Sequence, residues 1–163
     1  MDRTDYTDHM ADFVDVETAT DVLQDSPAAP TLSDAEADDR LDFFVKKDGQ
    51  VFAGTHLIVD LEGVTRIDDA DHIESSLIAA AQKAGATVLN SDFHVFSPNN
   101  GVSGVIVLAE SHISIHTWPE RNFAAVDVFM CGACNPSDTI PVLKEAFKPS
   151  HMTVQEIKRG LQI

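Results

Sequence analysis

The chain has 163 residues, a hydrophobic content of 44% and a formal net charge of −16, which together predict one globular domain with its own core. Nucleic acids and anionic membranes are bound by clustered Lys and Arg, so neither is expected as a partner. The longest apolar runs are far shorter than the roughly 20 residues that span a bilayer. The acidic amino terminus also lacks the pattern of a signal peptide, and we expect a cytoplasmic protein.

The acidic charge is concentrated at the amino terminus. Residues 1–42 contain 13 of the 27 acidic residues and only two basic ones, so they carry −11, whereas the remaining 121 residues carry −5. This segment has too few apolar side chains to offset the entropy of ordering. We therefore expect a disordered extension over residues 1–42, or a segment that docks on a partner through Phe13 and Leu23, followed by one domain over residues 43–163.

Helix and strand patterns alternate after residue 42. Residues 69–84 predict a helix, because apolar side chains recur at helical spacing, acidic residues begin the segment and Gly85 follows it. Ser137 is a candidate N-cap for a second helix that runs through Leu143 to Phe147. Runs typical of strands, separated by short turn clusters, cover residues 55–61, 86–96, 102–109, 112–118, 123–130 and 152–157.

Consecutive strands joined by short turns favour antiparallel pairing. The spacing predicts a hairpin whose turn contains Glu110 and Ser111, and a further turn over residues 119–122. With two helices among the strands, the sequence predicts an α+β fold: a two-layer sandwich of a largely antiparallel sheet with helices packed on one face.

Three separated blocks carry most of the chemistry-bearing residues: Gly101-Val-Ser-Gly-Val105, the run from Glu110 to Glu120, and the run from Ala125 to Gly132. In order and spacing they resemble the short prokaryotic class of S-adenosylmethionine decarboxylases, over residues 54–160. The resemblance implies a proenzyme that cleaves itself between Glu110 and Ser111 into chains 1–110 and 111–163. It also implies a pyruvoyl cofactor made from Ser111, with no metal.

The chemistry explains why a serine is required at the cleavage site. The hydroxyl of Ser111 lies beside its own upstream carbonyl, so an N-to-O acyl shift to an ester gains from proximity. The ester oxygen then leaves by elimination once a base removes the Cα proton, and the resulting dehydroalanine hydrolyses to pyruvoyl and ammonia. The resemblance implies that His116 is this base. It also implies that Ser103 hydrogen-bonds the Glu110 carbonyl or the tetrahedral intermediate.

The same resemblance implies the decarboxylation chemistry. The substrate amine forms a Schiff base with the pyruvoyl group, which acts as an electron sink while carbon dioxide leaves. Cys131, as a protonated thiol, is the implied proton donor. Glu120 is expected to bind the ribose hydroxyls of S-adenosylmethionine, and Phe96 or Trp118 its adenine ring or sulfonium. The product would be the aminopropyl donor of spermidine synthesis, made by a homodimer of cleaved protomers.

Strand alternation imposes a condition on this scheme. In an ideal strand His112, Ser114 and His116 share one face, while Ser111 lies on the other. His116 therefore reaches position 111 only if the chain bends, which requires a turn at Glu110-Ser111.

Alternatives follow from the same residues. His112, His116, Cys131 and Cys134 are residue types that bind zinc, although one Cys-x-x-Cys without a second pair is a weak signal. Cys134 departs from the family pattern, and oxidation that links it to Cys131 would remove the proton donor. The pyruvoyl chemistry would equally serve arginine or ornithine, and a third hypothesis is a non-enzymatic binding or regulatory protein that is never processed.

Overall fold

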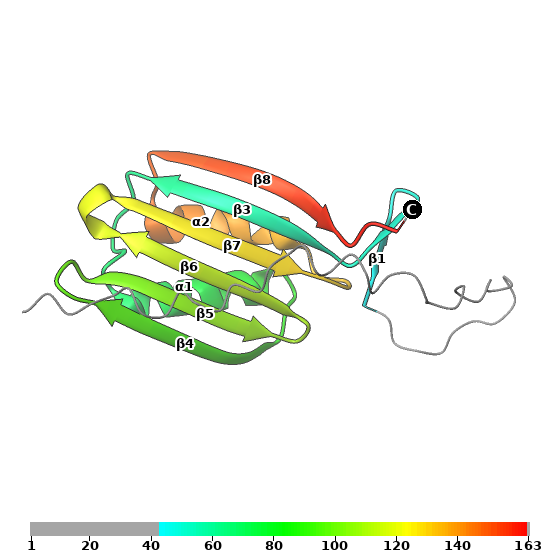
Figure 1. The fold of residues 1–163 in the computed structure, drawn as a ribbon, viewed down its shortest axis with the longest axis horizontal. Helices are drawn as coiled ribbons and strands as arrows, with labels where there is room; N and C mark the ends of the chain where they lie inside the picture. The colour runs from blue at the N-terminus through cyan, green and yellow to red at the C-terminus, as the bar shows by residue number, and fades with distance from the viewer. Residues whose placement is uncertain (1–42, 163) are drawn as a thin grey trace, which may run out of the picture. The chain divides into compact units, whose positions relative to one another are not determined.

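The computed structural model describes residues 43–162, so the expected extension over residues 1–42 lies outside the described residues. Six antiparallel strands form one sheet in the order β4-β5-β6-β7-β3-β8, and α1 and α2 cover one of its faces (Figure 1). The predicted α+β two-layer architecture is confirmed. The larger elements are β3 (Gly54–Glu62), α1 (Ala70–Lys83), β4 (Val88–Phe96), β5 (Gly101–Leu108), β6 (Ser111–Trp118), β7 (Phe123–Met130), α2 (Thr139–Phe147) and β8 (His151–Arg159).

Helix α1 shows how local sequence and packing agree. Its N-cap is Asp69, whose side chain accepts a hydrogen bond from the His72 amide at 3.0 Å. This bond and the Arg66 guanidinium hold the pKa of the Asp69 carboxyl below its usual value. Ile73 and Leu77 are fully buried against the sheet, as their helical spacing predicts.

The sheet has one face in the core and one face without helices. Burial alternates along β6 and β7, because successive side chains point to opposite faces. Leu57, Val59 and Leu61 of β3 belong to the core cluster beneath the helices. We call the other face of the sheet the open face; from β6 it carries His112, Ser114, His116 and Trp118.

Two boundaries differ from the sequence predictions. The β5–β6 turn consists of Ala109 and Glu110, and Ser111 is the first residue of β6. Ser137 is not the cap of α2: it lies within a 3-10 helix, Pro136–Asp138, and Asp138 precedes α2. This tight turn is closed by the Pro136 carbonyl, which accepts from the Thr139 hydroxyl at 2.7 Å.

A small hairpin precedes the main sheet and was not predicted. Strands β1 (Val45–Lys47) and β2 (Gln50–Phe52) pair with each other in a separate two-stranded sheet. The turn residues Asp48 and Gly49 both have positive φ angles, which suits a tight two-residue hairpin connection. Phe52 is 1% exposed, so the hairpin is anchored in the body of the domain.

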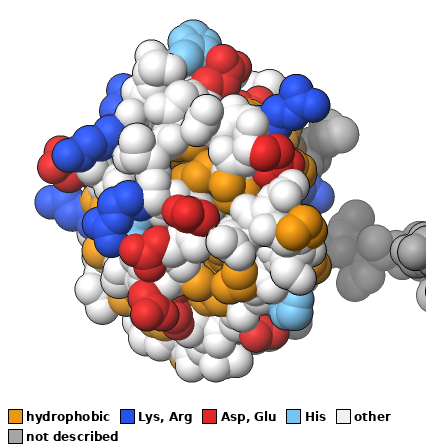
Figure 2. All heavy atoms as spheres, turned by 90° about the vertical axis from the view of Figure 1, so that its left-hand side faces the viewer, with side chains coloured by type: hydrophobic (Ala, Val, Ile, Leu, Met, Phe, Trp, Pro, Cys, Tyr) orange, Lys and Arg blue, Asp and Glu red, His pale blue; other side chains and the backbone are white. Residues whose placement is uncertain are grey.

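The described surface is mixed in character. Within residues 43–162 no helix is both long and apolar enough to cross a membrane. Figure 2 shows the end of the molecule at the left of Figure 1, where acidic and basic side chains lie interspersed around exposed hydrophobic ones. Neither sign of charge forms a continuous field on this end.

Thr117 is a buried polar residue that joins the sheet to the loop before α1. It is 6% exposed, and its hydroxyl donates to the Ile67 carbonyl at 2.7 Å and accepts from the Val102 amide at 2.8 Å. Removing this hydroxyl would leave one buried donor and one buried acceptor without partners.

We expect Thr117→Val to lower the free energy of unfolding by about 2 kcal/mol, the cost of leaving buried groups unpaired. Urea denaturation followed by circular dichroism measures the change. Thr153→Val on the exposed strand β8 is the matched control and should change stability little. Equal stability of the two variants would contradict the role assigned to the buried hydroxyl.

Candidate active site

The turn between β5 and β6 holds Glu110 in an uncommon backbone conformation. Leu108 pairs with Ser111 across the hairpin, so Ala109 and Glu110 form a two-residue connection. Glu110 has φ of 57°, a left-handed value that Gly and Asn adopt far more readily than Glu. The peptide bond between Glu110 and Ser111 therefore begins at a strained residue.

Cys131 contacts both sides of this peptide bond. Its thiol donates to the Glu110 carbonyl at 2.9 Å, and its backbone amide donates to the Ser111 hydroxyl at 3.2 Å. The sulfur lies 3.6 Å from the same hydroxyl, and Ser111 is only 6% exposed. The structure thus brings Glu110, Ser111 and Cys131 together. Within one copy the group on the Glu110 carbonyl is Cys131, whereas the Ser103 hydroxyl lies against His116.

Ser103 and His116 form a second cluster. They are directly opposite each other on β5 and β6, and the Ser103 hydroxyl lies 2.7 Å from Nδ1 of His116. If Nδ1 carries the proton and donates it to Ser103, Nε2 is left as the basic atom of the ring. His94 is the partner of Ser103 on β4, and its ring contacts that of Phe96 with a centroid distance of 4.5 Å.

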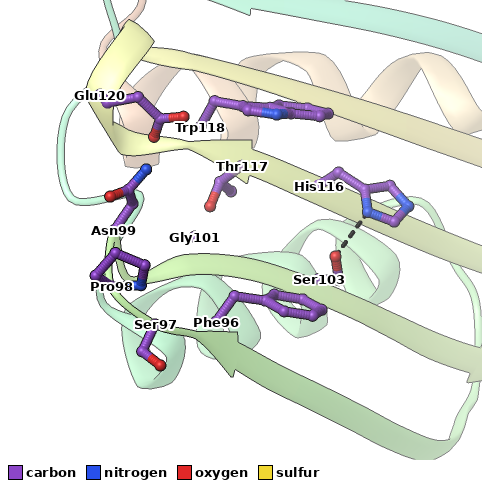
Figure 3. Close-up of a pocket in the computed structure, with 10 residues that line it drawn as sticks. All are labelled: Phe96, Ser97, Pro98, Asn99, Gly101, Ser103, His116, Thr117, Trp118 and Glu120. Carbon is purple, nitrogen blue, oxygen red and sulfur yellow. Dashed lines mark hydrogen bonds between the residues drawn. The ribbon is translucent and has the colours of Figure 1, made fainter. Parts of the chain in front are cut away.

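A pocket of about 240 Å³ opens beside this second cluster. Figure 3 shows Phe96 and Trp118 on the strands either side of β5, with Gly101 between them and Glu120 near the rim. Phe96 and Trp118 are 50% and 41% exposed, so both rings are available to a ligand. All the residues predicted to bind substrate line it; the complete lining is Phe96, Ser97, Pro98, Asn99, Gly101, Ser103, His116, Thr117, Trp118 and Glu120.

The two clusters lie apart in the chain that carries them. Ser111 and His116 are five residues apart on the continuous strand β6, which corresponds to about 16 Å at the rise of a strand. The turn that the sequence analysis required is present, but it lies before Ser111 and leaves β6 straight from Ser111 to His116. The bend does not bring His116 to position 111.

His112 belongs to neither cluster. Its ring stacks on Phe129 at 5.6 Å and meets the edge of His56 at 6.4 Å, while His56 lies 3.2 Å from the Asp127 carboxylate. Burial, and then the neighbouring His56, lower the pKa of His112. We infer a neutral ring that packs within the open face at neutral pH.

The zinc alternative receives no support from this arrangement. His112 and His116 share a face but are four residues apart, about 13 Å along the strand, which is too far for one ion. Among the described residues, no three His, Cys, Asp or Glu side chains gather closely enough to hold a metal.

Several pocket residues were not selected from the sequence. Asn99 had been assigned only to a turn and Thr117 only to a strand, yet both line the pocket. His94, outside the lining, pairs with Ser103 in the sheet register, and its ring meets that of Phe96. None carries a local signal, because their roles depend on which strands pair. The left-handed Glu110 was equally hidden, since Glu is not typical of that conformation.

Comparisons with known proteins find one family. The S-adenosylmethionine decarboxylase family profile matches residues 55–160. The S-adenosylmethionine decarboxylase proenzyme of Thermomicrobium roseum is 46% identical over 109 residues, covering 66% of this chain and 94% of the relative. That of Methanococcus maripaludis is 49% identical over 111 residues, covering 66% and 90%.

A solved structure is similar as well. The crystal structure of the adenosylmethionine decarboxylase from Aquifex aeolicus is 36% identical, with a TM-score of 0.57, and the match covers 69% of this chain and 94% of that one. The span matched by the family profile, residues 55–160, contains both clusters, the Ala109-Glu110 turn and the pocket. This chain belongs to the S-adenosylmethionine decarboxylase family.

Proposed function

We propose that this chain is a self-processing decarboxylase that acts on S-adenosylmethionine and uses a pyruvoyl group made from Ser111. The observation that carries the proposal is the contact of Cys131 with both the Glu110 carbonyl and the Ser111 hydroxyl. A hydroxyl beside a carbonyl that already accepts a hydrogen bond is the arrangement an N-to-O acyl shift needs. The residues at this turn therefore fit a cofactor derived from Ser111.

The proposed processing begins with an attack by Ser111 and ends with the release of ammonia. The Ser111 hydroxyl attacks the Glu110 carbonyl carbon; the carbon–nitrogen bond breaks and leaves an ester and a free amine. The Cys131 thiol stabilises the negative charge on the carbonyl oxygen. A base then removes the Ser111 Cα proton, and the Glu110 carboxylate leaves from Cβ. Water hydrolyses the resulting dehydroalanine to the pyruvoyl group and ammonia.

His116 of a second copy is the base that we propose for this step. The distance of about 16 Å along β6 keeps the Ser103–His116 pair away from Ser111 of its own chain. If two open faces pack with their strands running in opposite directions, the pair of each copy is brought to the cleavage turn of the other. This assembly accommodates both clusters without bending either strand.

The surface supports such an assembly. Large hydrophobic side chains that are 41–50% exposed include Phe96, Val107, Trp118 and Ile157, and the strand register places all four on the open face. Exposed apolar patches of this kind mark protein interfaces, and two sheets pack face to face at about 10 Å. The pocket of about 240 Å³ is also smaller than the roughly 300–1,000 Å³ of complete ligand sites.

The same residues then serve decarboxylation. The pyruvoyl group supplies the electron sink that side chains lack. Cys131 returns a proton to the substrate, so it must be a thiol at that step. Phe96 and Trp118 provide faces for the adenine or the sulfonium, and Glu120 accepts from the ribose hydroxyls.

The cysteines suit a reducing compartment, because both Cys131 and Cys134 are free thiols, and we propose a cytoplasmic location.

Cys134 is half-buried, and burial raises the pKa of its thiol, with Cys131 and Glu110 adding to the effect. The thiolate fraction of Cys134 at neutral pH is therefore small. The two cysteines are separated by the Gly132-Ala133 turn, which is a short enough span for a disulfide to be considered.

Ser111→Ala should abolish cleavage, because the attacking hydroxyl is removed. Intact mass spectrometry should find chains 1–110 and 111–163 in the native protein, the second with a pyruvoyl terminus, and one uncleaved chain in the variant. Ser114→Ala on the same strand is the control and should cleave normally. Cleavage of Ser111→Ala at this bond would contradict the proposal.

The substrate is tested on the cleaved native protein by the release of carbon dioxide. We expect S-adenosylmethionine to be decarboxylated and ornithine and arginine to be inert, because neither amino acid has a ring to stack between Phe96 and Trp118. Preference for a basic amino acid would reassign the substrate. A native protein that stays intact would instead favour the non-enzymatic alternative.

Mixing two inactive variants tests whether the site is shared between copies. We expect His116→Ala and Ser111→Ala to remain uncleaved alone, and co-refolding them to restore cleavage of the His116→Ala chain, because its partner supplies the intact histidine. A mass tag on one variant identifies which chain is cut. If no cleavage returns in an assembly shown to contain both variants, the base acts within its own chain.

Oxidation tests the role of Cys134. A small-molecule disulfide should accept two electrons from Cys131 and Cys134, linking them and stopping decarboxylation. The reaction should be faster at pH 9 than at pH 7, because the raised pKa of Cys134 limits its thiolate at the lower pH. Peptide mass mapping detects the bond, dithiothreitol should reverse it, and Cys134→Ser cannot form it. Unchanged activity under the oxidant would rule the hypothesis out.

A further inference from the structure

The segment before β1 reaches the turn that carries Cys131. The family match begins at residue 55, so Phe43 and the β1–β2 hairpin lie outside it. The Phe43 carbonyl accepts a hydrogen bond from the Gly132 amide at 2.7 Å. The Phe43 ring also lies over Gly132: a Cβ added there would be 3.6 Å from its Cδ1.

The β1–β2 hairpin, which follows this segment, contacts the carboxyl-terminal part of the chain. The Val51 carbonyl accepts from the Gln162 amide at 2.8 Å, and the Lys158 ammonium donates to the Gln50 side chain at 2.6 Å. The same ammonium lies 5.3 Å from the centre of the buried Phe52 ring. Strand β2 is therefore held against the carboxyl-terminal part of the chain. The segment before β1 extends from this hairpin to Gly132.

The contact acts on Cys131 through a shared peptide plane. The amide of Gly132 belongs to the peptide unit that begins at the Cys131 carbonyl carbon, and this unit is planar. A hydrogen bond to the Gly132 amide therefore restricts rotation next to the Cys131 Cα. The opposite side of Cys131 is held by its own amide, which donates to the Ser111 hydroxyl. Gly132 has φ of 62°, so few other residues would leave the turn in this shape.

We infer that the segment before β1, through Phe43, positions the Cys131 thiol on the Glu110 carbonyl and thereby sets the rate of self-cleavage. The inference rests on the proposed role of Cys131 in processing. Phe43 is a positioning residue: it touches Gly132, not the reacting atoms. It is 45% exposed, so its replacement should loosen the turn without removing core packing.

The test compares Phe43→Gly with Lys47→Ala, an exposed substitution on β1 that does not contact the turn, and with Phe43→Tyr, which keeps the ring. Two rates are measured in the full chain: cleavage before Ser111, and alkylation of Cys131 by iodoacetamide in a background of Cys134→Ser and Ser111→Ala, in which the Glu110 carbonyl stays in an uncleaved peptide bond. Phe43→Gly keeps the backbone carbonyl but removes the ring beside Gly132 and frees the backbone of the segment. The weakened contact should slow cleavage about fivefold. It should also speed alkylation, because a thiol released from the Glu110 carbonyl is more accessible. Phe43→Tyr and Lys47→Ala should match the native chain in both.

The outcomes distinguish the positioning role of Phe43 from the proposed role of Cys131 in self-cleavage. Normal cleavage in Cys131→Ala would overturn the processing role of Cys131 itself. Slow cleavage in Cys131→Ala combined with a native cleavage rate in Phe43→Gly would overturn only the positioning role, whatever the alkylation rate. A slow Phe43→Gly whose alkylation rate equals that of the native chain would also overturn it, because the thiol would then not have moved.

Discussion

The antiparallel pairing of β5 with β6 is the constraint on which the site depends. Its register places Ser103 opposite His116 and Leu108 opposite Ser111, so two chemical clusters are fixed at separate points of one strand pair. Side-chain rotation spans a few ångströms, whereas the clusters are about 16 Å apart. A single copy therefore holds the Ser111 hydroxyl at one place and His116 at another, which is why the proposed processing draws its base from a second copy.

The β5–β6 hairpin that separates the clusters also constrains the Glu110–Ser111 bond, at which we propose cleavage. A two-residue connection forces Glu110 into the left-handed region, and the energetic cost of this is carried by the fold around it. The proposed cleavage before Ser111 would remove the constraint, since Glu110 would then be free to rotate. The Cys131 thiol already donates to the carbonyl that would develop negative charge, so little reorganisation is needed when the hydroxyl attacks.

Periodicity was sufficient for the main elements but not for their pairing. Ile73 and Leu77 predict α1 because helical spacing is a local property, and the alternating runs predict strands for the same reason. Because Ser111 and His116 lie on one strand, alternation also predicts that their side chains point to opposite faces of the sheet. The contact between Cys131 and Glu110 joins residues 21 positions apart, and no local pattern reports it. Strands β1 and β2 were missed because three-residue runs show too little alternation, although Asp48-Gly49 is a typical hairpin turn.

The hairpin's position relative to the family match indicates what kind of influence it can have. Relatives align over 90–94% of their own length within 109–111 residues, and the family match starts at residue 55, after the hairpin, so both clusters lie inside the family match and the hairpin lies outside it. A contact added outside that span cannot be the source of the chemistry, but it can change how tightly an existing turn is held. The segment before the hairpin reaches Gly132, the residue next to Cys131. Restricting the Gly132 backbone therefore affects the position of the Cys131 thiol, which donates to the Glu110 carbonyl. The described segment that contacts Lys158 of β8 and reaches Gly132 is therefore placed to adjust the timing of the proposed maturation while leaving the pocket residues unchanged.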